Sequence, residues 1–149
     1  MTLLSIHNKA ISKFIRVLPI ILLLTSCAVR LIAPYDAVTD EKVSDLQEEV
    51  VTKMIEWQRE VPPIAKEYSF YDHVESVLEI LILRNQNIEK SDIIVHSLQK
   101  LLDNIKIIKS AHEQEMLNTA FIAQVKPDIM AQFNAIQTFQ MALKKAEEK

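Results

Sequence analysis

The sequence predicts an all-α fold, an antiparallel up-down helical bundle of three to four helices. The chain of 149 residues contains no glycine, and the tight hairpin turns of β-folds become costly without it, because they need residues at positive φ. Apolar residues also recur at spacings of three and four, as they do on one face of a helix. Prolines and short polar stretches divide these stripes into segments of bundle length, which favours the bundle architecture.

The first expected helix spans residues 39–60. Thr39 can cap its start, and Asp40 and Glu41 in the first turn suit the helix dipole. The pair Pro62-Pro63 ends it, because proline cannot continue a helix and restricts the residue before it. Its apolar stripe consists of Val43, Leu46, Val50, Met54, Trp57 and Val61.

The second expected helix runs from Ile64 to about Arg84. Its middle, residues 77–83, is apolar on nearly every side, which predicts the most buried helix of the set. A short apolar run can also form a strand, but the helical spacing on both flanks favours a helix. The stripe consists of Ile64, Tyr68, Tyr71, Val74, Leu78, Leu81 and Ile82.

Two more helices complete the bundle. Ser91 followed by Asp92 is typical of a helix start, and this third helix fades near His112. The fourth opens around residues 118–119 and ends in the charged tail 144–149. Pro127 lies inside it and either kinks one long helix or starts a second piece; we expect one kinked helix.

The first 26 residues have the features of an export signal. Lys9, Lys13 and Arg16 stand there without an acidic residue, and residues 17–24 are apolar apart from Pro19. Only 13 residues separate Arg16 from Arg30, whereas a membrane span needs about 20. We therefore expect a signal helix in a signal peptide over 1–26, a tether over 27–38 and the helical bundle domain over 39–149.

The signal ends in Leu24-Thr25-Ser26-Cys27, and Cys27 is the only cysteine of the chain. This tetrapeptide resembles the lipobox of bacterial lipoproteins, in which the cysteine is acylated and becomes the first residue of the mature protein. An unpaired thiol in an exported chain also calls for an explanation, which acylation supplies. The alternatives are a signal anchor with an incidental thiol and a signal that is cleaved elsewhere.

The lipobox resemblance implies a place in the bacterial cell envelope. The protein would be held on the membrane by the lipid on Cys27 and would face the periplasm. Ala28 rather than aspartate follows the cysteine, and similarity to the sorting pattern of enterobacterial lipoproteins then points to the outer membrane.

A second resemblance reaches the mature chain at scattered positions. They are Cys27, Arg30-Leu31-Ile32, Tyr35-Asp36, Thr39-Asp40, Leu46-Gln47, Phe70-Tyr71 and residues 132–136. Together they look like a family of small proteobacterial lipoproteins that has no assigned function. The resemblance implies an α-helical periplasmic domain on an acylated cysteine, and it supplies no catalytic residue.

Charge and composition argue against several kinds of partner and chemistry. Without residues 1–26 the chain has 14 Lys and Arg against 20 Asp and Glu, a net charge of −6, which does not suit nucleic acid or a broad electrostatic contact with anionic lipid. The lack of glycine removes phosphate-cradling loops, the dinucleotide fingerprint and the nucleophile elbow. We therefore expect no enzymatic activity.

The histidines and carboxylates do not form a recognisable metal or cofactor pattern. No glutamate lies three residues before His73, His96 or His112, as a di-metal site in a bundle requires, and a single cysteine excludes covalent haem attachment. Glu75 and Glu79 fit a solvated row better than an acid–base pair. We expect no catalytic residue, no metal and no cofactor.

Five residues are candidates for contact with a partner or ligand. Trp57, Tyr68, Phe70 and Tyr71 lie around the first link between helices, where they either cap the core or form a binding patch. Arg84 follows an apolar run and either complements the end of the helix dipole or faces a carboxylate at the mouth of the bundle.

These observations predict a membrane-anchored lipoprotein whose bundle is a non-enzymatic interaction or structural module in the periplasm. Its partners would be the membrane, through the N-terminal lipid, and a periplasmic or outer-membrane protein. The alternative function is a carrier or sensor of a small apolar ligand bound in the bundle core.

Overall fold

The computed structural model describes residues 32–148, which contain four α-helices and no strand. The elements are α2 (Ala37–Trp57), the 3₁₀ turn η1 (Ile64–Lys66), α3 (Tyr68–Gln86), α4 (Asp92–Glu113) and α5 (Thr119–Glu147). The prediction of an all-α bundle is confirmed. The expected signal helix, Cys27 and the first part of the expected tether lie outside the described residues.

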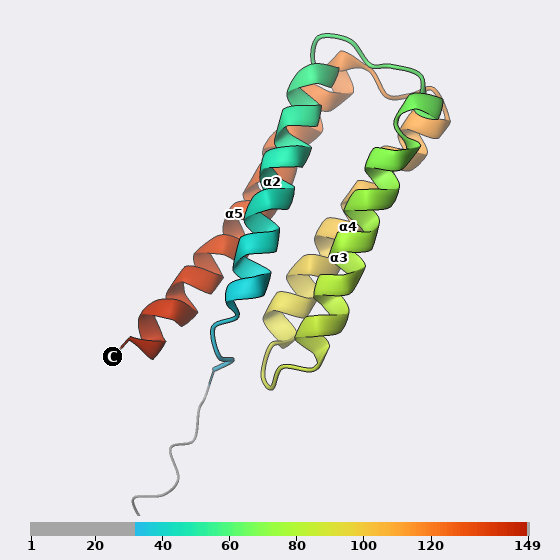
Figure 1. Cartoon of the computed structure of the whole chain (residues 1–149). Coiled ribbons are helices and arrows are strands. Elements are labelled where there is room, and N and C mark those ends of the chain that lie inside the picture. The colour runs from blue at the N-terminus through green and yellow to red at the C-terminus, as the bar shows by residue number, and fades with distance from the viewer. Residues whose placement is uncertain (1–31, 149) are drawn as a thin grey trace, which may run out of the picture. The chain divides into compact units, whose positions relative to one another are not determined.

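The four helices run alternately up and down (Figure 1). Helix α2 packs beside α5 and α3 beside α4, and contacts of α2 with α3 and of α4 with α5 close the ring. We call the end where the chain enters α2 the proximal end; it comprises residues 32–40, 83–93 and 141–148. The opposite end, with residues 55–70 and 111–121, is the distal end. None of the described helices is long and apolar enough to span a membrane.

The predicted apolar stripes meet in one core that runs through the bundle. Members from every helix are almost completely buried, among them Leu46, Leu78, Leu98 and Phe133. The expectation that residues 77–83 form the most buried helix is wrong, because Ile80 and Leu83 are 63% and 61% exposed. In a ring of four helices none is central, so each keeps one face in solvent.

The predicted helix starts are partly wrong. Helix α2 begins at Ala37 after Asp36, and Thr39 is fully buried inside the first turn. Ser91 does precede α4, but its hydroxyl donates back to the carbonyls of Asn85 and Ile88 and caps no helical N–H. Asn118 is a true cap of α5, because its Oδ1 accepts from the backbone N–H of Phe121 at 2.9 Å.

Two links use left-handed backbone without glycine. Lys90 between α3 and α4 has φ 65°, and Glu115 after α4 has φ 57°. At Glu115 the chain forms a Schellman motif, in which the N–H of Met116 donates to the Ala111 carbonyl at 2.9 Å and that of Glu115 to the His112 carbonyl at 3.1 Å. Helix α5 passes through Pro127 without a break, so the prediction of a single helix there is confirmed.

Candidate functional site

The proximal end is held together by an ion pair between α3 and the residue before α2. Arg84 donates to Asp36 through Nε at 2.6 Å and Nη2 at 2.8 Å, and Thr39 donates to the same carboxylate at 2.7 Å. These hydrogen bonds, that of Arg84 above all, hold the pKa of the largely buried Asp36 at about 2, although burial opposes the shift. Arg84 thus has the carboxylate partner that one interpretation expects, and it also lies in the last turn of α3, where the other places it.

Further hydrogen bonds fix the segment that precedes α2. The backbone N–H of Tyr35 donates to Glu147 at 3.1 Å, the Tyr35 hydroxyl donates to Asp40 at 2.9 Å, and Ala33 is buried. Asn85 donates to Thr39 at 2.8 Å and so extends the network into the core. The described part of the expected tether is thus docked on α3 and α5, and its last two residues already belong to α2.

The distal end is closed by an aromatic cap. Trp57 packs edge-on against Phe70 with ring centroids 5.4 Å apart and lies 5.7 Å from Tyr71. Trp57 and Tyr71 are each only 1% exposed, whereas Tyr68 is 43% exposed and stands outside the cluster. A partner that docks on this end of the folded domain would therefore meet Tyr68 and not the other three aromatic residues.

His112 is a member of this cap that sequence reasoning missed. Its Nε2 lies 2.6 Å from the carbonyl of Pro62 and its Nδ1 lies 3.2 Å from the Tyr71 hydroxyl. Because a carbonyl only accepts, Nε2 carries the proton and Nδ1 accepts from Tyr71, and burial raises the pKa of Tyr71. The signal was present, since His112 continues the stripe of Leu101, Ile105 and Ile108.

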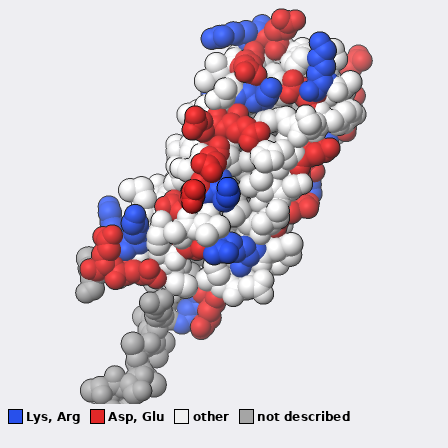
Figure 2. Space-filling view, viewed as in Figure 1, with Lys and Arg blue, Asp and Glu red and all other residues white. Residues whose placement is uncertain are grey.

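Other charged residues form ion pairs between α3 and α4. Lys109 joins Asp72 at 3.2 Å and Glu75 at 3.0 Å, and Lys106 joins Glu79 at 3.5 Å, which links α3 to α4. Figure 2 shows acidic side chains in a row along the face that α2 presents to solvent. Within residues 32–148 no group of three or more His, Cys, Asp or Glu side chains is placed to hold a metal ion.

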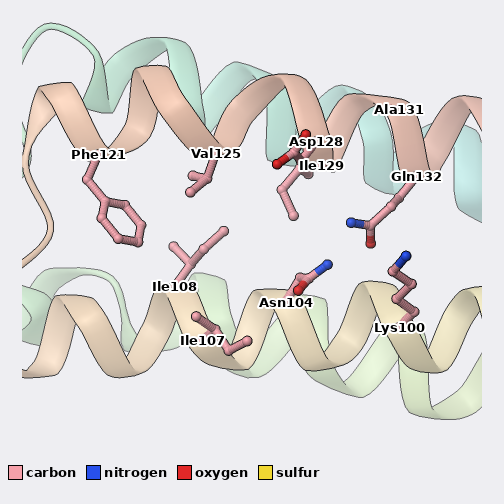
Figure 3. Close-up of a pocket in the computed structure, with 10 residues that line it drawn as sticks. All are labelled: Lys100, Asn104, Ile107, Ile108, Phe121, Val125, Asp128, Ile129, Ala131 and Gln132. Carbon is pink, nitrogen blue, oxygen red and sulfur yellow. The ribbon is translucent and has the colours of Figure 1, made fainter.

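A groove of about 400 Å³ lies between α4 and α5 (Figure 3). One half is apolar and is lined by Ile107, Ile108, Phe121, Val125 and Ile129. In the other half Lys100, Asn104 and Gln132 face one another across the two helices, and Asp128 also lines the groove. The Gln132 Oε1 is buried there and has no hydrogen-bond partner within the described part of the chain. The sequence did not predict this groove, because it depends on how α4 and α5 lie relative to each other.

Comparison of the chain with protein-family models, curated proteins and solved structures finds no match in any of the three.

Proposed function

We propose that this protein is a lipid-anchored lipoprotein of the bacterial envelope, held at the outer membrane and facing the periplasm. Its bundle is a non-enzymatic interaction or structural module. The basic and apolar N-terminus that ends at the lone Cys27 supports the anchor. Several acyl chains, at about 0.8 kcal/mol per buried CH₂, would make that attachment effectively permanent.

We call the hydrogen bonds that Tyr35 and Asp36 form at the proximal end the clamp. The clamp is the structural observation that carries the proposal. Asp36 and Tyr35 tie the segment before α2 to α3 and α5. A lipid on Cys27 would then be joined, over a short stretch of sequence, to a segment that is fixed on the bundle. Such coupling is useful to a module that presents one end of a bundle to a partner at a set distance from the membrane.

Mass spectrometry of the membrane-extracted protein tests the anchor. We expect an N-terminal diacylglyceryl-modified Cys27 and loss of that species in Cys27→Ser. The variant Ser26→Ala keeps a small residue in the lipobox and is the matched control that should still be processed. An unmodified Cys27, or a mature N-terminus elsewhere, would contradict the anchor.

Crosslinking in cells tests the interaction module. A photo-crosslinking amino acid at Tyr68 would report on the distal end, where this side chain is 43% exposed. We expect one specific envelope protein to be captured there. The same probe at the exposed Glu48, on the acidic face of α2, is the control that should not capture it. Recovery of no specific protein would favour the second function.

The groove between α4 and α5 supports that second function, the binding of a small ligand. The bundle core is filled by side chains from all four helices, so the ligand would lie in the groove and not in the core. The apolar half would take a short alkyl chain, and Lys100 would face an anionic head group.

Calorimetric titration with decanoate tests the groove. We expect saturable binding that is lost in Val125→Gln, because this substitution places an amide in the apolar half. Ile80→Gln changes an exposed residue on α3 that does not line the groove, and it should bind as the wild type does. Equal binding by all three proteins, or no binding by any, would contradict a ligand in this groove.

A further inference from the structure

We propose that the proximal end of the bundle contacts the membrane surface directly, with the side chains of Ile32, Val38, Leu83 and Ile93 among the lipid head groups. This inference rests on the proposed function, because it takes the lipid to be on Cys27. It adds an orientation and a second, non-covalent membrane contact.

The four side chains come from separate parts of the proximal end. Ile32 precedes α2, Val38 lies in its first turn, Leu83 in the last turn of α3 and Ile93 in the first turn of α4. They are 49%, 43%, 61% and 61% exposed, respectively. Figure 1 shows the start of α2 and the α3–α4 link at the same end of the bundle. Apolar side chains that gather at one end of a protein mark a surface that something covers.

The short sequence separation between Cys27 and Ile32 identifies the membrane as the surface that covers the proximal end. The distal end also exposes Ile55, Tyr68 and Met116, so exposure alone does not choose between the ends. Only four residues lie between Cys27 and Ile32, so the five steps from one to the other reach at most about 18 Å when fully extended. Helix α5 has 29 residues and is about 44 Å long. The proximal end is therefore the end that an anchor on Cys27 brings to the lipid.

The clamp keeps the length of chain between Cys27 and the bundle short. Ala33 is buried, Tyr35 is bound to Glu147, and Asp36 is bound to Arg84. The segment that is fixed on the bundle thus begins next to Ile32, a member of the proposed contact. Without these contacts residues 32–36 would add to the length of chain between Cys27 and the bundle.

The charges at this end fit apolar insertion better than electrostatic attraction. Lys144 and Lys145 stand beside Glu147 and Glu148 at the end of α5, and Lys90 pairs with Glu89. Figure 2 shows both signs side by side near the end of the chain. Over the whole proximal end six acidic residues stand against four basic ones. Because this end has no excess of positive charge, the contact should form on zwitterionic lipid and should not need anionic head groups.

The test uses the mature acylated protein in phosphatidylcholine vesicles. Because the lipid blocks the thiol of Cys27, a cysteine introduced at Leu83 can be labelled alone with an environment-sensitive fluorophore. Met116→Cys at the distal end, where the native side chain is 53% exposed, is the matched control. We expect the label at position 83 to shift to the blue and to be quenched by spin-labelled lipids, and the label at position 116 to emit as it does in water.

Three results would overturn the proposal. If both labels stay in water while the protein still floats with the vesicles, the anchor holds but the bundle stands off the membrane. If both labels are quenched, the bundle lies along the surface. If the unlabelled protein does not float with the vesicles, the anchor itself fails and the contact fails with it. Ile93→Cys is a second proximal position, at a side chain that is also exposed, in case Leu83→Cys folds poorly.

Discussion

Asp36 joins two helices through one carboxylate. It accepts from Arg84 on α3 and from Thr39 inside α2, and Asn85 in turn donates to Thr39. A carboxylate with such partners is favoured in its charged form, so its pKa of about 2 lies below the ordinary 3.8. The folded state therefore gains stability from the ionised form of this residue.

We expect Asp36→Asn to lower the free energy of unfolding by about 1 to 2 kcal/mol at pH 7, a value that allows for the partial exposure of Arg84. Because the folded-state pKa is depressed, this contribution is fully present above about pH 4 and is lost as the pH falls through about 2. Urea unfolding followed by circular dichroism at pH 7, 4 and 2.5 measures this. The difference in the free energy of unfolding between wild type and variant should become smaller as the pH falls.

A control separates this pair from the general effect of acid. Asp45 pairs only loosely with Lys42, at 3.8 Å, and its side chain is 65% exposed. Asp45→Asn should change the free energy of unfolding by less than about 0.5 kcal/mol at any of these pH values. A gap between wild type and Asp36→Asn that stays constant down to pH 2.5 would show that the carboxylate charge is not what stabilises the proximal end.

The end of α4 shows how a chain without glycine terminates a helix. Glu115 takes the left-handed position of the Schellman motif, which glycine normally occupies. A residue with a Cβ pays roughly 1–2 kcal/mol for this conformation. The hydrogen bonds of Met116 and Glu115 to the last turn of α4 hold it in place.

We expect Glu115→Gly to raise the free energy of unfolding by about 1 kcal/mol, since it relieves this backbone conformation at an exposed position. Glu113→Gly, two residues earlier and still helical, removes the same charge but should lower stability by up to about 1 kcal/mol. Thermal or urea unfolding of both variants measures the difference. The same sign for both would mean that charge and not backbone conformation dominates.

The helices and the core could be predicted because they depend on spacing within a segment. Periodicity alone predicts that Leu46, Leu98 and Phe133 lie on the buried faces of their helices, and they are buried as expected. The start of α2 could not be predicted, because Asp36 is held by Arg84, 48 residues away. Local preference favours Thr39 as the cap, whereas the tertiary contact of Asp36 places the start of the helix at Ala37.

The candidate sites show the same division between local and tertiary information. The aromatic cap of Trp57, Phe70 and Tyr71 followed from residues that flank one link. The groove between α4 and α5 and the role of His112 required the relative placement of two or three helices. Sequence reasoning thus located the groups that neighbouring residues assemble and missed those that distant residues assemble.

At the scale of the whole molecule, the bundle can be viewed as the pair of α2 with α5 packed against the pair of α3 with α4. Trp57 on α2 reports on the contact between these pairs, because its ring packs against Phe70 and Tyr71 on α3 and lies 5.6 Å from His112 on α4. It is also the only tryptophan of the chain. Its emission therefore follows the separation of the pairs, whereas far-ultraviolet circular dichroism follows all helices.

We expect the two signals to give the same midpoint in urea. One core runs through all four helices, and a single domain of this size usually unfolds in one cooperative step, with a slope of about 1–3 kcal/mol per molar urea. If the pairs separated first, Trp57 would become exposed and its emission would shift to the red while the helices persisted. A midpoint for Trp57 at lower urea than for helicity would thus divide the bundle into two stable helix pairs, α2 with α5 and α3 with α4. Coincident midpoints would mean that the clamp at one end and the aromatic cap at the other belong to one cooperative unit. An anchor at the proximal end would then hold a bundle whose two ends unfold together.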